Sequence, residues 1–362
     1  MRITFLLGNG FDLNLGLKTR YQDFYKYYLN QPSKSLSVIA FKGQLSKNLE
    51  NWSDLEIELG KYAKNFNKDN EENFIDLLYD IQDNLAEYLD QQDRQFDVSN
   101  SDKEKALDDL INFEKYLTQR DRKVFSNYNN FGNNNISVFT FNYTKTFEKI
   151  YNWNGAQITI DNRRINGSSY YDRINLFEHI HGTTMNNMIL GVNDPSQILS
   201  DDLKDSIKTL RSFIKTEMNY NTGTLRDERC VESIEKSDII CIYGMSLGDT
   251  DKYWWRKIGD RMANSSTVLV IFAKKDEIIP NRRGYAQAGN KDLIKNIFLS
   301  HLEFDDTLKS KISKRILVCL NSEMFKVNLD YAMQQPNAKD AFISAEKLLE
   351  KELNDLKKSL DK

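Results

Sequence analysis

The chain has 362 residues, of which 40% are hydrophobic and 28% are charged, and its formal net charge is −3 at pH 7. This is a globular composition, long enough for one large domain with an insertion or for two domains. The near-neutral charge, with Lys and Arg spread along the chain, argues against a dedicated nucleic-acid-binding surface.

Three widely spaced cysteines and no Cys-x-x-Cys pair exclude a disulfide framework and a cysteine-rich zinc site. The N-terminus lacks the features of a secretion signal, and no apolar run reaches the ~18 residues of a membrane span. We therefore expect a cytoplasmic protein without a membrane partner.

The first predicted element is a β-strand over Arg2 to Leu7, which leads directly into the turn Gly8-Asn9-Gly10-Phe11-Asp12. An aromatic-rich run from Tyr21 to Tyr28 follows at helical spacing. A strand, a glycine turn and a helix in this order direct backbone N–H groups at a phosphate. Because glycine has no Cβ, the backbone of the turn can approach the phosphate closely. The spacing is neither Gly-x-Gly-x-x-Gly nor a P-loop, so a simple tight turn is the alternative.

Residues from about 33 to 130 carry apolar side chains at i, i+3 and i+4, which predicts an almost purely helical segment. We interpret 31–130 as a large helical insertion after the first βα unit. The Lys- and Glu-rich end of the chain predicts a C-terminal helical tail, assigned to 321–362.

Six further strands are predicted, most of them separated by helices: Ile136–Phe141, Gln157–Ile160, Ile174–Ile180, Asp238–Tyr243, Thr267–Phe272 and Ile316–Leu320. This alternation indicates an α/β domain with a parallel sheet, built from 1–30 and 131–320. Ligands of such sheets bind at the carboxyl ends of the strands.

Four polar or glycine-containing clusters lie at these strand ends: Gly8–Asp12, Asn142–Thr144, His181–Gly182 and Gly244–Asp251. Because the carboxyl ends of parallel strands meet at one edge, we expect the clusters to converge. Together they form a stronger signal than any one cluster alone.

The four clusters resemble the bacterial abortive-infection AbiH family. That family opens with a strand and Gly-Asn-Gly-Phe-Asp-Leu, and later carries Phe-Asn-Tyr-Thr, His-x-His-Gly and Gly-Met-Ser-Leu. The same motifs stand here, in the same order, at residues 8–13, 141–144, 179–182 and 244–247. The resemblance extends to about Phe272 and implies a role in defence against phage.

A more distant similarity relates these positions to sirtuin-type NAD-binding domains. Their Gly-Ala-Gly-Ile-Ser, Asn-Ile-Asp, His-Gly and Gly-Thr-Ser-Leu motifs match this chain in order and mostly in type. Asp12 replaces the motif serine, Thr144 replaces the aspartate, and the four-cysteine zinc module is missing. The resemblance therefore implies a sirtuin-like, Rossmann-type sheet and NAD chemistry more than deacetylation.

Three residues are the catalytic candidates under this resemblance. His181 would abstract a proton from water or a ribose hydroxyl, Asn142 would orient that group, and Asp12 would stabilise an oxocarbenium-like centre. The alternatives are a structural histidine and helix-capping roles for Asn142 and Asp12. His179 and His181 could form a metal pair, but no third ligand stands at recognisable spacing, so no metal is predicted.

The predicted contacts to the cofactor come from both glycine turns: Gly8, Asn9, Gly10, Phe11, Gly244 and Ser246. We expect an effector that hydrolyses NAD⁺, as substrate, at the nicotinamide–ribose bond. The alternatives are a metal-dependent nuclease or nucleotide hydrolase and a non-catalytic nucleotide-binding sensor. The expected partners are NAD or a related nucleotide, a phage-derived trigger or companion defence protein, and a further copy of the chain.

Overall fold

The computed structural model describes residues 1–47, 52, 54–126, 132–165, 167–275 and 283–326. It contains a seven-stranded sheet, with a strand at each of the seven predicted positions. The strands are β1 Arg2–Leu7, β2 Asn134–Thr140, β3 Ile158–Ile165, β4 Ser168–His179, β5 Ile239–Tyr243, β6 Val268–Ala273 and β7 Ile316–Leu320. Residues 327–362, most of the predicted tail, lie outside the described residues.

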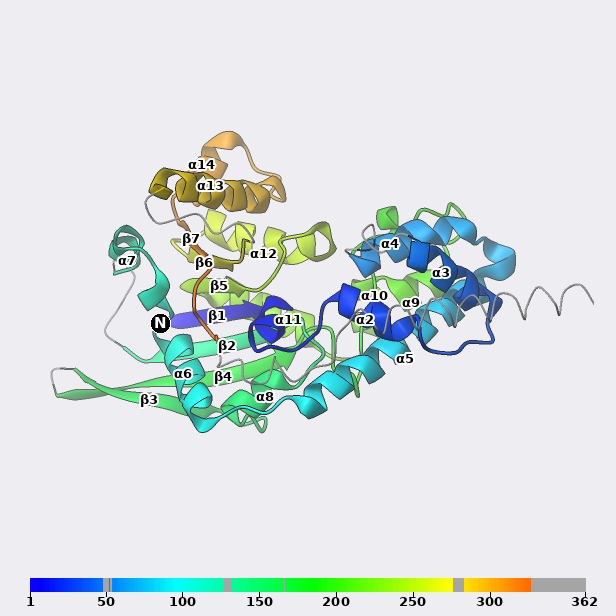
Figure 1. Ribbon diagram of the computed structural model, residues 1–362. Coiled ribbons are helices and arrows are strands. Elements are labelled where there is room, and N and C mark those ends of the chain that lie inside the picture. The colour runs from blue at the N-terminus through cyan, green and yellow to red at the C-terminus, as the bar shows by residue number, and fades with distance from the viewer. Residues whose placement is uncertain (48–51, 53, 127–131, 166, 276–282, 327–362) are drawn as a thin grey trace, which may run out of the picture. The chain divides into compact units, whose positions relative to one another are not determined.

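The strand order is β3-β4-β2-β1-β5-β6-β7, which can be followed from one side of the sheet to the other in Figure 1. β1 is central and pairs in parallel with both β2 and β5. β4, β6 and β7 continue the parallel arrangement, and only β3 runs antiparallel. The predicted α/β class is confirmed: this is a Rossmann-like α/β fold with a mostly parallel sheet.

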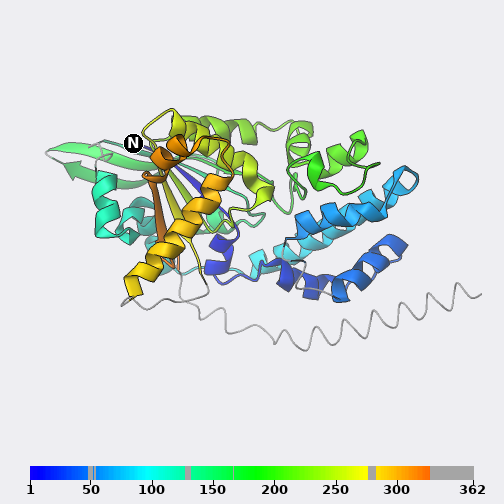
Figure 2. The same cartoon turned by 90° about the horizontal axis from the view of Figure 1, so that it is seen from above.

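The β3–β4 hairpin differs from its prediction because both strands are longer than the apolar pattern indicates. β4 has twelve residues, and β3 pairs with its first half. Residues Asp161 to Arg164 and Ser168 to Tyr170 are polar or partly exposed, so an apolar pattern cannot mark them as strand. Figures 1 and 2 both show this hairpin extending past the amino ends of the other strands.

Helices cover the sheet on both faces, since the central strands are buried on both sides. On one face Leu6, Ile240 and Ile271 join a core with Trp255 and Phe298. The helices there are α11 Arg226–Lys236, α12 Lys252–Ala263, α13 Gly284–Ser300 and α14 Asp306–Ser313.

The opposite face of the sheet carries Phe5, whose ring meets Phe113 edge-on at 5.6 Å. Tyr151 joins this layer by donating to the carbonyl of Ala106. The elements of this layer are α6 Asn100–Ile111, η4 Phe113–Tyr116, α7 Gln119–Ser126 and α8 Thr146–Tyr151. The sheet is therefore the middle layer of three.

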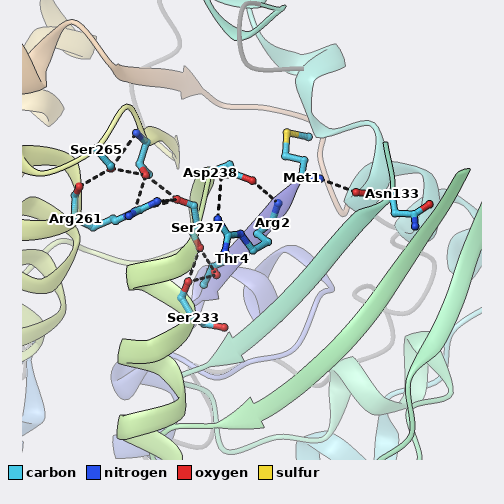
Figure 3. A network of polar contacts seen from close by, with 10 residues as sticks. Met1, Arg2, Thr4, Asn133, Ser233, Ser237, Asp238, Arg261 and Ser265 are labelled. Atoms are coloured by element: carbon cyan, nitrogen blue, oxygen red, sulfur yellow. Dashed lines mark hydrogen bonds and ion pairs between the residues drawn. The ribbon is translucent and has the colours of Figure 1, made fainter. Parts of the chain in front are cut away.

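A buried polar network joins the amino ends of β1, β5 and β6 (Figure 3). The hydroxyls of Thr4 and Ser237 are 2.6 Å apart, and both residues are at most 2% exposed. The carbonyl of Ser237 accepts hydrogen bonds from Arg261 and Thr267, while Asp238 accepts from the backbone N–H of Arg2. These contacts fix the strand register at the edge opposite the predicted site.

By mutual contacts the described residues form two compact units. The first contains the sheet and comprises 1–15, 97–181 and 225–326; the second comprises 16–96 and 182–224. The second unit contains α2 Tyr21–Tyr28, α3 Leu36–Lys47, α4 Leu55–Tyr62, α5 Glu71–Gln95, α9 Ile207–Phe213 and α10 Lys215–Asn221. The domain boundaries at residues 30, 130 and 320 stay predictions.

The second unit contains a buried ion pair between α4 and α10. The Lys215 ammonium lies 2.8 Å from a carboxylate oxygen of Glu56, and both side chains are less than a tenth exposed. The backbone N–H of Gly191 donates to the other oxygen of Glu56 at 3.2 Å. The pair therefore ties two helices and a connecting segment together within this unit. No described helix combines the length and the apolarity that a membrane crossing requires.

Candidate functional site

The turns after β1 and β5 pack backbone against backbone. The N–H of Gly10 donates to the carbonyl of Gly244 at 2.8 Å, and the N–H of Gly8 donates to that of Tyr243 at 2.9 Å. A Cβ on Gly10 would lie 2.4 Å from the Cα of Gly244, whose φ of +69° itself favours glycine. The glycines of the two predicted motifs thus permit this close approach of the two turns.

This meeting point is the topological switch point of the sheet. The last elements of the connection from β1 to β2 are α6, η4 and α7, which lie on one face of the sheet. The connection from β5 to β6 places α12 on the other face. In open α/β sheets ligands bind at such a point, outside the carboxyl ends of the strands. The motifs at Gly8 and Gly244 therefore flank the position where the fold favours a ligand.

The N–H groups of the first turn are used inside the protein. In addition to Gly8 and Gly10, the N–H of Phe11 donates to the carbonyl of Gly8 at 2.9 Å. The Phe11 ring is 1% exposed and packs 5.2 Å from Phe325. Asn9, in contrast, is exposed. The predicted phosphate cradle stays a prediction, and the described contacts give this turn a structural role.

Asn142 follows β2 and reaches across to the end of β1. Its side-chain amide donates to the carbonyl of Gly8 at 3.2 Å, and its backbone N–H donates to the hydroxyl of Thr140 at 3.1 Å. The residue is 7% exposed. The structure thus brings Asn142 to the first glycine turn, as the strand-end argument predicts.

Asp12 is buried, at 1% exposed, and both carboxylate oxygens accept hydrogen bonds from threonines. Thr144 donates to one oxygen at 2.6 Å and Thr146 to the other at 2.7 Å. These contacts connect the turn after β1 to the start of α8. The catalytic role of Asp12 stays a prediction. Its described contacts hold the turn after β2, which carries Asn142 and Thr144.

His181 lies just after β4 and is 5% exposed. Its ring meets Phe141 edge-on at 5.2 Å and lies 6.4 Å from the ring of Tyr143. Both aromatic residues flank Asn142 in the sequence, so the ends of β2 and β4 are adjacent at His181. Asn142 and His181, two of the three predicted catalytic residues, therefore lie at neighbouring strand ends.

The turn after β5 is held by residues that sequence reasoning missed. His301 forms a 2.8 Å hydrogen bond through Nε2 to the carbonyl of Leu247, and the Trp255 indole donates to the carbonyl of Gly248 at 3.0 Å. Leu247 has a φ of +55°, uncommon for a bulky residue. Ser246 beside it is exposed. His301 could have been noticed only as the third histidine of the chain, because no local motif surrounds it.

Nucleophilic thiols and a clustered metal site find no support among the described residues. Burial raises the pKa of the Cys230 and Cys241 thiols well above the usual range of a thiol. Burial also raises the pKa of the Cys319 thiol, to about 11. All three thiols therefore stay protonated near neutral pH. No group of three or more His, Cys, Asp or Glu residues in the described part of the chain is placed to hold a metal ion.

The fold and the strand-end clusters define a class: a Rossmann-like α/β protein whose candidate site lies at the switch point of its sheet. Comparison with protein families assigns the chain further. The model of the family described as bacteriophage abortive infection AbiH matches residues 4–272, and the chain belongs to this family. No curated protein matches the chain significantly. The family's description connects the chain with abortive infection, a bacterial defence against phage.

Proposed function

We propose that the chain is an abortive-infection effector that hydrolyses NAD⁺ at the nicotinamide–ribose bond and so depletes NAD in infected cells. The observation that carries the proposal is the convergence of four clusters at the ends of adjacent strands β4, β2, β1 and β5. Asn142 contacts Gly8 beside the switch point, where α/β sheets bind ligands, and the His181 ring packs against the two aromatic residues that flank Asn142.

The proposed reaction breaks the bond between the ribose C1′ and the nicotinamide nitrogen. The bonding electron pair leaves with neutral nicotinamide, and the ribose passes through an oxocarbenium-like state. Water forms the new C1′–O bond and gives up a proton, for which His181 is the base. Asn142 orients the attacking water or a ribose hydroxyl with its amide. Exposed Asn9 and Ser246, one on each glycine turn, contact the dinucleotide.

The sirtuin-type resemblance supports this proposal even at the two motif positions where this chain has a different residue. Asp12 stands where the resemblance has serine, and Thr144 stands where it has aspartate. In this chain the two side chains are hydrogen-bonded at 2.6 Å. Both motifs therefore have one hydroxyl and one carboxyl at these two positions, but in this chain the carboxyl comes first and the hydroxyl second. In the proposed site Asp12 positions the turn that carries Asn142.

The proposal is tested with purified protein by measuring nicotinamide release from NAD⁺, with and without extract from phage-infected cells. His181→Ala should lose at least ~100-fold in rate, because general-base catalysis typically contributes that much. Gly289→Ala is a matched control: it lies on α13, and no atom would lie within 4 Å of its Cβ. Nucleic-acid or nucleotide cleavage that a chelator abolishes, with NAD⁺ intact, would contradict the proposal.

A further inference from the structure

Both ring nitrogens of His179, the last residue of β4, face oxygen acceptors. Nδ1 is 2.8 Å from the carbonyl oxygen of Asn142, and Nε2 is 2.9 Å from a carboxylate oxygen of Glu148 on α8. The side chain is 9% exposed and meets the ring of Phe177 edge-on. His179 thus connects three elements next to the candidate site.

These contacts determine where protons must lie. A backbone carbonyl can only accept, so Nδ1 of His179 must carry a hydrogen. Nε2 then faces Glu148, and that hydrogen bond needs one more proton between the two groups. The second oxygen of Glu148 is buried and has no hydrogen-bond partner among the described residues, so the described hydrogen bond of this side chain is the one to His179.

We propose that His179, which also contacts Glu148, is a positioning residue for Asn142. The ring holds the Asn142 carbonyl from one side, while the Asn142 amide is fixed to the carbonyl of Gly8 on the other. His179 therefore positions the Asn142 side chain indirectly, by holding the backbone carbonyl of Asn142. The catalytic consequence rests on the proposed function, whereas the contact itself does not.

Two substitutions of His179 separate positioning from simple structural support. Asparagine places its amide nitrogen where Nδ1 stands and keeps the donor to Asn142. Glutamine places its amide nitrogen near Nε2 and keeps the contact to Glu148. We expect His179→Asn to retain most of kcat. His179→Gln should lose about 10–100-fold in kcat with little change in KM, because misplacing a reacting group by about 1 Å costs this much. A purely structural link between β4 and α8 would give the reverse order.

Nuclear magnetic resonance provides a readout that needs no activity. In protein with nitrogen-15-labelled histidine there are three rings to assign. The His179 ring should carry a hydrogen on Nδ1, the nitrogen that faces the Asn142 carbonyl. The side-chain amide signal of Asn142 should be kept in His179→Asn and shifted in His179→Gln.

The outcomes separate the two proposals. A His179 ring without hydrogen on Nδ1 in the unmodified protein, or equal effects of the two substitutions on both kcat and the Asn142 signal, overturns the positioning role. If the unmodified protein releases no nicotinamide even with infected-cell extract, the proposed function fails. The ring protonation and the Asn142 signal then still decide whether His179 holds Asn142.

Discussion

Gly10 and Gly244 lie so close that neither position has room for a side chain. A Cβ on Gly10 would fall 2.4 Å from the Cα of Gly244, and the obstructing atoms are backbone, which cannot rotate away. We expect Gly10→Ala to lower the free energy of unfolding by roughly 2 kcal/mol, the typical cost of forcing an extra methyl group into a packed site. Urea denaturation measures this as a lower midpoint.

The matched control is Gly289→Ala on α13, where no atom lies within 4 Å of the added Cβ. Alanine is a better helix former than glycine, so this substitution should raise the free energy of unfolding by about 1 kcal/mol. Equal midpoints for Gly10→Ala and the unmodified protein would contradict the account of the two turns.

The sequence predicts the residues at the strand ends better than it predicts their partners. Asn142 and His181 are predictable because each follows an apolar run whose end the pattern marks. The partners of Asp12 are not, because Thr144 and Thr146 stand more than 130 positions away. His301 holds the turn at Leu247 from an α-helical region with no motif of its own. Such contacts depend on how segments far apart in the sequence pack together, which local periodicity does not determine.

Among the elements, α6 and η4 are joined to the segment after β7 by one buried carboxylate. Asp109 is fully buried and accepts from Lys105 and Lys115, each at 2.6 Å, from the Tyr116 hydroxyl, and from the Phe325 backbone N–H at 2.7 Å. Burial raises the pKa of this carboxyl, but the hydrogen bonds outweigh burial and leave the pKa below its ordinary value.

The pKa shift of Asp109 predicts a pH-dependent contribution to stability. A carboxyl with a lowered folded-state pKa stabilises the fold above its unfolded-state pKa, and this contribution is lost as pH falls toward the folded-state pKa. We expect Asp109→Asn to cost about 2 kcal/mol near neutral pH, the scale of hydrogen bonds to charged groups. The difference from the unmodified protein should shrink below about pH 4. Urea titrations across this range test it; a difference that is constant with pH would contradict it.

At the level of elements, all seven strand positions are predictable, but the direction and length of the hairpin strands are not. β1, β5, β6 and β7 are apolar and almost entirely buried, and they stand out in the sequence. β3 and the first half of β4 present polar, partly exposed residues, since only their hairpin partner needs to cover them. A polar, exposed edge strand carries little of the burial signal on which prediction depends.

Considered as a whole, the molecule gathers all three of its histidines at one edge of its sheet. His181 lies beyond β4, His179 holds the turn beyond β2, and His301 holds the turn beyond β5. The opposite edge carries the Thr4 and Ser237 network, whose groups are paired with one another (Figure 3). The fold class was predictable from the alternation of strands and helices, whereas the two compact units, which interleave along the chain, were not.

We propose that this AbiH-family protein consumes NAD⁺ in infected cells through His181. The most direct test is mass spectrometry of nucleotides before and after phage challenge, in cells with the unmodified protein, His181→Ala or Gly289→Ala. We expect loss of NAD with release of nicotinamide in cells with the unmodified protein or Gly289→Ala. In cells with His181→Ala we expect no loss of NAD and no protection against phage. Unchanged NAD in infected cells that are still protected would contradict it.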